Sequence, residues 1–259
     1  MYAAERQHAI ERTLIEQGRV GVVELARRFD VTTETIRRDL DQLEAAGALR
    51  RVHGGAVPRE HASTVEPTLT ERMLRHGPAK SAIGQCAARV LAEDFHGSVY
   101  FDAGTTTAAV AAALAARLGE GRIEAVTHAL SLGSSLAQIP GIALTAIGGR
   151  VRGATAAAVG AGTVREISSL RPDIAFIGTN GISAGFGLST PDPDEAAAKS
   201  AIVAAARTVV VVADADKFDT ELLVRFAGLD DVDILVTDAA PPADLAAALA
   251  ENNVEVRVA

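Results

Sequence analysis

Two pairs of arginines lie in the first 60 residues, at positions where their side chains can bind anions. Arg37 and Arg38 follow a cluster of threonines, and Arg50 and Arg51 come shortly before His53. A guanidinium group can bind a phosphate or donate two hydrogen bonds to one guanine in the major groove of DNA. The first chemistry that the sequence indicates is therefore the binding of nucleic acid.

A second group of small, polar and cationic residues is spread over the C-terminal part, mostly just after apolar runs. Its members are Asp102, Gly104, Thr105, Thr106, Thr107, His128, Gly149, Arg150, Asn180, Gly181, Lys199 and Lys217. The threonines offer hydroxyls, and the amides at the start of the next helix can bind a phosphate. Taken singly, such residues are usually turn, surface or core residues. Their shared position after strands favours one common anion site.

The segments around the first arginine pair have the apolar spacing of short helices. The expected helices are 5–17, 22–29 and 33–46. In the third, Ile36, Leu40 and Leu43 are spaced i, i+4, i+7 and point to the interior. Thr32 is a good N-cap, because its hydroxyl can accept a hydrogen bond from an amide of the first turn.

The second arginine pair lies in a predicted hairpin, "ALRRVHGGAV", that turns at Gly54 and Gly55. Three helices and a hairpin make a winged helix-turn-helix. Its expected DNA-contacting residues are Thr33, Thr35, Arg37, Arg38, Arg50, Arg51 and His53. The alternative is a solvated helix face, with the first arginine pair bound to Glu34 and Asp41. The basic hairpin that follows the same helix favours DNA binding.

The chain from Pro78 onward alternates between strand-like and helix-like runs. Runs such as "TVVVVA" are apolar throughout, as expected of strands that are covered on both faces. The alternation predicts an α/β domain with a mostly parallel sheet. In such sheets ligands bind beyond the carboxyl ends of the strands, where the second group of residues would lie.

The distribution of charge supports a division into two parts. The chain has 259 residues and a formal net charge of -8. Residues 1–60 hold 10 Arg and no Lys against 10 acidic residues, so the acidic excess lies entirely in the remainder. We expect a DNA-binding domain over 1–57, a linker over 58–77 with one short helical stretch around 70–75, and an effector-binding domain over 78–259.

Several other classes of protein are disfavoured by what the sequence lacks. It has no run of 18 apolar residues and no apolar segment near the start, so we expect a cytoplasmic protein without a membrane span. The single cysteine, Cys86, cannot form an intramolecular disulfide. There is no HExxH or CxxC spacing, no GxxxxGK[ST] loop and no GxGxxG, so we expect no metal and no cofactor.

The segment "GRVGVVELARRFDVTTETIRRDLDQLEAAGALRRVHGGAV" resembles the N-terminal signature of the DeoR family of bacterial transcriptional regulators. The pieces "DAGTTT", "IGGRVR", "DIAFIGTNGI", "EAAAK" and "ADADKF" resemble the sensor domain of that family. The resemblance implies a DNA-binding domain and a domain that senses phosphorylated sugars, similar in fold to ribose 5-phosphate isomerase. The family commonly has Asn where this chain has His128, which bears on the identity of the sugar.

These observations together predict a transcriptional regulator. We expect a repressor of carbohydrate-metabolism genes that binds double-stranded operator DNA as a homo-oligomer, a dimer or a tetramer, and that a phosphorylated sugar releases. The alternative is a sugar-phosphate isomerase-like enzyme carrying a DNA-binding domain, with Glu195, Asp102 and Lys217 as base and cation. The segment "GISAGFGLSTPDPDE" does not resemble the loops of that isomerase. We therefore expect a non-enzyme.

Overall fold

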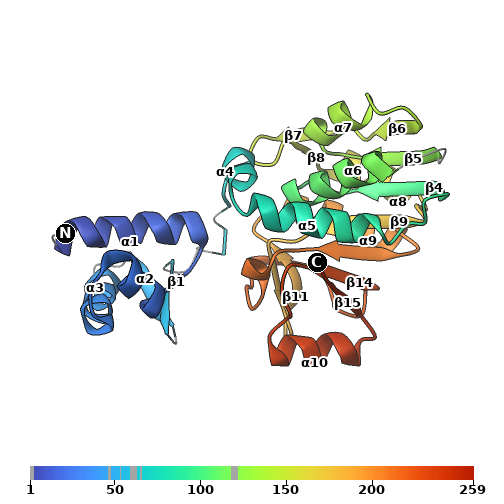
Figure 1. Cartoon of the computed structure of the whole chain (residues 1–259). Helices are drawn as coiled ribbons and strands as arrows, with labels where there is room; N and C mark the ends of the chain where they lie inside the picture. Colours follow the sequence, from blue (N-terminus) through green and yellow to red (C-terminus); the bar gives the residue numbers. More distant parts are fainter. Residues whose placement is uncertain (1–2, 46–47, 53, 59–62, 65, 118–121) are drawn as a thin grey trace. The chain divides into compact units, whose positions relative to one another are not determined.

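The computed structural model describes residues 3–45, 48–52, 54–58, 63–64, 66–117 and 122–259. The chain divides into two compact units, Met1–Val65 and Glu66–Ala259 (Figure 1). Among the described residues, no helix is both long enough and apolar enough to cross a membrane.

The first unit has the predicted winged helix-turn-helix architecture. Its elements are α1 (Ala3–Gln17), β1 (Val20–Gly21), α2 (Val22–Phe29), α3 (Thr33–Ala45), β2 (Leu49–Val52) and β3 (Gly55–Pro58). The hairpin of β2 and β3 is antiparallel, and β1 adds a third strand by pairing Val20 with Ala56. The sequence analysis did not predict β1, because a strand of two residues has no periodicity to detect.

The core of the first unit is formed by the apolar stripes of the three helices. Ile36, Leu40 and Leu43 of α3 are buried, as their spacing predicts, and pack with apolar residues of α1 and α2. The Arg6 guanidinium donates two hydrogen bonds to the Asp39 carboxylate, at 2.5 and 3.1 Å, and so fastens α1 to α3. The outer face of α3 is thereby held on a rigid base.

The second unit is an α/β domain. Its helices are α4 (Leu69–Leu74), α5 (Gly77–Ala88), α6 (Thr105–Arg117), α7 (Leu130–Leu136), α8 (Ala161–Ser168), α9 (Pro193–Ala205), η1 (Ala215–Lys217) and α10 (Ala243–Glu251). The strands of its main sheet are β4 (His96–Phe101), β5 (Arg122–Thr127), β6 (Ile142–Ala146), β9 (Ile174–Gly178), β12 (Val209–Val212), β14 (Ile234–Thr237) and β15 (Glu255–Val258). Its shorter strands are β7 (Arg150–Arg152), β8 (Ala157–Val159), β10 (Gly181–Ser183), β11 (Gly187–Thr190) and β13 (Val224–Ala227).

The main sheet is wholly parallel, with the strand order β15-β14-β12-β9-β4-β5-β6. From β4 the chain adds β5 and β6 on one side and then returns to add β9 and β12 on the other. The adjacent strands β4 and β9 are therefore the point where the order reverses. Crevices at such points, beyond the carboxyl ends of the strands, are where α/β domains bind ligands.

Helices cover both faces of this sheet. Apolar residues of α5, α6 and α7 form one buried cluster against it, and those of α8, α9 and α10 form a second cluster against the opposite face. Strand β12 is buried at every position, which explains its continuous apolar sequence. Helix α6 begins at the edge where β4 ends, because it follows β4 in the chain, and Lys199 of α9 reaches the same edge by bonding to the Gly178 carbonyl oxygen at the end of β9.

The structure differs from two features of the predicted organisation. Residues 66–77, expected within the linker 58–77, belong to the second unit, and the short helical stretch expected there is α4, which begins at the capping box of Thr68 and Glu71. The segment between β9 and α9 was not predicted to contain strands, but it forms β10 and β11, and β11 pairs with β13 in an antiparallel sheet. Strands of three or four residues, broken by glycines, gave no clear alternation.

Candidate functional site

The outer face of α3 carries the first group of candidate residues. The Thr32 hydroxyl accepts a hydrogen bond from the Thr35 amide at 3.2 Å, which confirms the predicted N-cap. Arg37 and Arg38 are exposed, whereas Thr33 and Thr35 are half-buried. Among the described residues, the Arg37 side chain contacts only Glu34, at 3.4 Å, and both side chains are more than half exposed. Such a pair is weak and leaves the guanidinium available.

The wing is tied to the same helix through Arg51. Its guanidinium donates to Asp41 and to the carbonyl oxygen of Arg37, the latter at 3.1 Å, and its amide donates to Glu44 at 2.7 Å. These bonds fix the orientation of the hairpin relative to α3. The structural role of Arg51 leaves fewer of its donors for DNA. The Arg50 side chain and His53, also predicted to contact DNA, lie outside the described residues.

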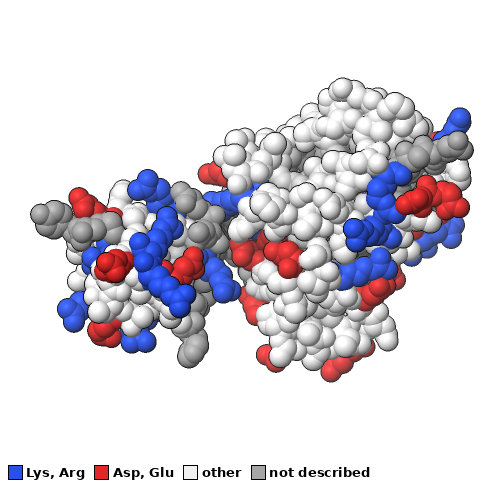
Figure 2. Space-filling view, in the orientation of Figure 1, with Lys and Arg blue, Asp and Glu red and all other residues white. Residues whose placement is uncertain are grey.

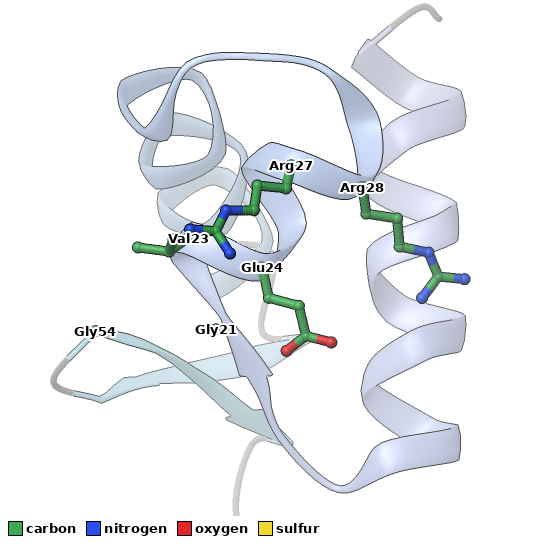
Figure 3. A pocket seen from close by; sticks show the side chains of 6 residues that line it. All are labelled: Gly21, Val23, Glu24, Arg27, Arg28 and Gly54. Carbon is green, nitrogen blue, oxygen red and sulfur yellow. The ribbon is translucent and has the colours of Figure 1, made fainter.

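Helix α2 presents two further arginines that the sequence analysis did not include. Arg27 and Arg28 are exposed and, with Glu24, Val23, Gly21 and Gly54, surround a shallow hollow of about 610 Å³ (Figure 3). Basic and acidic side chains alternate over the visible face of this unit (Figure 2). The helix before the recognition helix crosses the DNA backbone in helix-turn-helix complexes, so these arginines can bind phosphates.

Asp102 is the centre of the second candidate site, at the point where the strand order reverses. It follows β4, and its side chain is 1% exposed. The Lys199 ammonium donates to Asp102 Oδ2 and to the Gly178 carbonyl oxygen, the latter at 2.8 Å, and the Gly178 amide donates to the same Oδ2 at 3.0 Å. The other carboxylate oxygen, Oδ1, is buried and has no hydrogen-bond partner among the described residues. An unpaired buried acceptor can accept a hydrogen bond from a water molecule or from a ligand.

His128 follows β5, and its side chain lies beside that of Asp102 at the same end of the sheet. Its Nδ1 lies 3.0 Å from the Tyr100 hydroxyl, and its Nε2 lies 3.8 Å from Asp102 Oδ1. Burial lowers the pKa of His128 to about 4, against the raising effect of Asp102. The imidazole is therefore neutral at pH 7 and has one donor and one acceptor nitrogen to offer.

The loop between β4 and α6 holds the next candidates. Thr107 is fully buried, and its hydroxyl donates to the carbonyl oxygens of Asp102 and Gly104, at 2.8 and 2.9 Å, so it shapes the loop. Thr105 and Thr106 are half-buried in the first turn of α6, and their hydroxyls have no hydrogen-bond partner in the described part of the chain. These two residues, with the free amides of the turn, are the groups that can bind a phosphate.

A cluster of charged side chains lies near Asp102 and Lys199, on the side of α9. Arg152 donates at 2.9 Å to Asp192, at 3.1 Å to Glu195 and also to Glu66. The Asn180 amide donates to Glu66 at 3.3 Å. Glu195 lies one helical turn before Lys199 and also accepts from Thr155. Burial raises the pKa of Glu195, and the nearby charge of Glu66 raises it further.

Several predicted site residues have other roles in the structure. Arg150 is exposed and pairs with Asp194 on α9. Lys217 lies in η1, where its charge is close to that of Lys80, and no bond joins its side chain to Asp102 or Glu195 among the described residues. The base and cation of the isomerase alternative are therefore not assembled, because Lys199 and Arg152 hold its two carboxylates.

Two predicted site glycines are required by packing. A Cβ on Gly149, whose φ is 154°, would lie 2.0 Å from the Thr163 hydroxyl oxygen. A Cβ on Gly181 would lie 2.3 Å from the Thr220 carbonyl oxygen. Neither position tolerates a side chain, so their presence needs no ligand to explain it.

The sequence analysis missed Glu66, Arg72, Arg152 and Tyr100, all of which contact predicted site residues or one another. Arg152 could have been predicted, because the motif "RVR" places its side chain on the same face of β7 as that of Arg150. No local sequence pattern identified Glu66 or Tyr100 as a site residue, since their partners are far away in the sequence.

Comparison with known families covers both units. Residues 6–61 match the family described as DeoR-like helix-turn-helix domain, and residues 75–239 match DeoR C terminal sensor domain. The chain is 36% identical to the HTH-type transcriptional regulator GlpR of Haloferax volcanii, over 94% of this chain and 93% of that protein. The chain belongs to the DeoR family of transcriptional regulators.

Other members of the DeoR family match along the whole chain. The glycerol-3-phosphate regulon repressor of Escherichia coli is 31% identical, with 100% of both chains covered. The putative aga operon transcriptional repressor of Escherichia coli O157:H7 is 28% identical, over 98% of this chain and 93% of that protein. Among solved structures, ribose 5-phosphate isomerase from Methanocaldococcus jannaschii matches 54% of this chain and 53% of its own, at 15% identity and a TM-score of 0.40. That likeness concerns the fold alone.

The DeoR-family matches include most of the candidate residues. The helix-turn-helix match contains α3 and the wing, and the sensor match contains Asp102, His128 and Lys199. Residues 62–74 lie between the two matched ranges. Glu66 and Arg72 are in that interval, although Glu66 pairs with Arg152 and the Arg72 carbonyl oxygen accepts from Lys80, both residues of the matched sensor range.

Proposed function

We propose that this DeoR-family protein is a repressor of carbohydrate-metabolism genes whose hold on double-stranded operator DNA is weakened by a phosphorylated sugar. The observation that carries the proposal is that DNA-binding and sensor domains of one regulator family match a single chain. The relatives named as repressors, among them that of the glycerol-3-phosphate regulon, support repression and a phosphorylated effector.

For DNA binding, we propose that α3 lies in the major groove and that the β2–β3 hairpin reaches the adjacent backbone. Arg37 and Arg38 then read bases or bind phosphates, and Arg27 and Arg28 of α2 bind the flanking backbone. A monomer of this kind reads one half-site, so we also propose a homo-oligomer, which light scattering on the full chain would test.

Replacement of Arg38 by alanine is expected to weaken operator binding without loss of folding, because the Arg38 side chain is exposed and bonds to no described residue. A lost phosphate contact should reduce the slope of log affinity against log salt concentration by about one, whereas a lost base contact should cost about 1–3 kcal/mol at one base pair. The measurement is fluorescence anisotropy with a duplex that the protein selects from a random pool. Arg122→Ala, an exposed arginine of β5, is the matched control. Equal affinity of Arg38→Ala and the control would rule out α3 as the recognition helix in this orientation.

For the effector, we propose that the phosphate binds at the amino end of α6, beside Thr105 and Thr106, and that the sugar hydroxyls meet Asp102 and His128. The unpartnered Asp102 Oδ1 supports this assignment, because a sugar hydroxyl can donate to it. His128 can exchange a hydrogen bond with a further hydroxyl through Nε2. Lys199 holds Asp102 in position, and so acts on the sugar through it.

Thermal unfolding with a panel of sugar phosphates tests the effector site. At 100 times its dissociation constant, a ligand of the native state alone should stabilise the protein by about 2.7 kcal/mol and raise its melting temperature. The panel includes glycerol 3-phosphate, fructose 1-phosphate and ribose 5-phosphate, each with its unphosphorylated parent. We expect one phosphorylated compound to raise the melting temperature and its unphosphorylated parent to leave it unchanged. Thr106→Ala should abolish the increase. Stabilisation by parent and phosphate alike would refute a phosphate site.

We further propose that the protein senses its ligand without converting it. The two carboxylates that an isomerase would need as base are engaged, Asp102 by Lys199 and Glu195 by Arg152 and Thr155. The ribose 5-phosphate sample of the same panel checks this, because NMR would detect ribulose 5-phosphate if turnover occurred.

A further inference from the structure

Glu66 is the first residue of the second unit, and its carboxylate is buried in the charged cluster beside the proposed effector site. Its side chain is 2% exposed. It accepts hydrogen bonds from Arg152 and, at 3.3 Å, from the Asn180 amide, and it lies 3.3 Å from Arg72 Nη1. A carboxylate taken almost wholly out of water and bound by two guanidinium groups fills an anion-binding position.

The Glu66 carboxylate does not accept a hydrogen bond from every donor at this position. Arg72 Nε and Nη2 are buried and have no hydrogen-bond acceptor among the described residues. A carboxylate has two oxygens, whereas a phosphate offers three and a charge near -2, so it can accept from more of these donors at once. The two unpaired donor atoms of Arg72, whose side chain is 18% exposed, therefore indicate that the position suits a larger anion than Glu66.

This position is next to the proposed effector crevice. Helix α4, which carries Arg72, contacts α6 and is anchored by the Leu69 amide, which donates to the Ala154 carbonyl oxygen at 3.0 Å (Figure 1). Arg152 binds Glu195, and Glu195 lies one turn of α9 before Lys199, the partner of Asp102. The anion position and the crevice thus share α6 and α9.

We propose that Arg72, Arg152 and Asn180 form a second anion site, separate from the one at Thr105 and Thr106, and that the Glu66 carboxylate fills this second site in the free protein. The proposal rests on the proposed function for the position of the effector at the neighbouring strand ends, but the anion site itself follows from the cluster. Once Glu66 withdraws, Arg152 keeps its bonds to Asp192 and Glu195, whereas Arg72 has no carboxylate partner left among the described residues. The cluster then loses the excess negative charge that would repel a phosphate.

The exchange provides a route from this second anion site to the DNA-binding unit. Residues 66–68 have no regular structure, and Glu66 directly follows the last residue of the first unit in the chain. The buried Glu66 carboxylate therefore anchors the segment that leads to that unit. When a phosphate binds Arg72 and Arg152, the Glu66 carboxylate is released. The free and the phosphate-bound protein therefore differ in whether the segment that leads to the first unit is anchored.

Titration of inorganic phosphate into Glu66→Gln by calorimetry, in a buffer free of phosphate and sulfate, tests the anion site. We expect the variant to bind phosphate more tightly than the wild type, by a factor between about 5 and 150, the usual range of coupling between sites. The gain should disappear in Glu66→Gln/Arg72→Ala. Glu251→Gln, which removes an exposed carboxylate from α10, should bind phosphate as the wild type does. Unchanged or weaker binding by Glu66→Gln would overturn the proposal.

Hydrogen exchange of the wild type provides a second readout that does not depend on folding of a variant. Saturating phosphate should speed exchange of the amides of residues 66 and 68–72, including that of Leu69, because Glu66 no longer anchors this segment. Slower or unchanged exchange there would contradict the release of Glu66.

Neither the calorimetric nor the hydrogen-exchange experiment requires DNA, so their results can be separated from those on operator binding. If a sugar phosphate weakens operator binding and Glu66→Gln behaves as the wild type, this inference fails while the proposed function stands. If Glu66→Gln gains phosphate affinity and no sugar phosphate affects operator binding, the reverse holds.

Discussion

Lys199→Met is expected to lower the free energy of unfolding of the second unit by about 3–5 kcal/mol, the usual cost of removing one partner of a buried ion pair. The side chains of Lys199 and Asp102 are 6% and 1% exposed, so the carboxylate left behind cannot be solvated by water. Methionine keeps the length of the aliphatic chain, which separates the loss of charge from the loss of packing. Urea unfolding followed by circular dichroism gives the free energy.

The double variant Asp102→Asn/Lys199→Met distinguishes charge from other causes. It leaves no unpaired charge, so most of the lost stability should return. A single-variant cost below about 1 kcal/mol, the value typical of exposed pairs, would contradict the buried pair. The same argument makes Thr106→Ala a cleaner test of the effector site than any substitution of Lys199, because it leaves this pair intact.

The stability of the protein is expected to fall as the pH is lowered from 6.5 toward 4 through the protonation of His128. Burial lowers the pKa of His128 in the folded protein to about 4, whereas the unfolded chain has the ordinary value of 6.5. Between these values the unfolded state binds the extra proton, so stability rises with pH across this window and is lost as pH falls. The difference between the two pKa values corresponds to about 3 kcal/mol.

His128→Asn removes this titration, and asparagine is the residue that the resemblance in the sequence associates with this position. The free energy of unfolding of the variant, measured in urea at pH 7, 6, 5 and 4.5, should decline less steeply than that of the wild type. The comparison uses the slope, because loss of the Tyr100 hydrogen bond also changes the absolute stability. His8→Asn, at an exposed position of α1, should keep the wild-type slope. Parallel curves for His128→Asn and the wild type would show that His128 does not stay neutral in the fold.

Local patterns made the first unit predictable. The spacing of Ile36, Leu40 and Leu43 fixed both the buried face of α3 and the exposed face with Arg37 and Arg38, because helical periodicity assigns every position at once. The parallel sheet was also predictable, since strands covered on both faces have continuous apolar sequences. Placing Asp102 and His128 in one crevice required only the rule that ligands bind beyond the carboxyl ends of strands.

The contacts of the second site were not predictable in the same way. The rule places a loop at an edge of the sheet but does not say which way each side chain points, which is why Lys217 makes no bond to Asp102 among the described residues, although it is near enough to Lys80 to lower the pKa of that lysine. Arg152 and Glu66 are 86 residues apart, and no local pattern connects them. Gly149 and Gly181 look the same in the sequence whether a ligand or a neighbouring atom requires them.

The most direct test of the account is the affinity for a selected operator duplex, measured by fluorescence anisotropy with and without the sugar phosphate that raises the melting temperature. The account predicts that this ligand raises the dissociation constant for the operator at least about fivefold, in line with ordinary coupling between sites. The unphosphorylated parent should have no effect. Operator affinity that stays the same while the sugar phosphate is bound would contradict the claim that the second unit controls DNA binding.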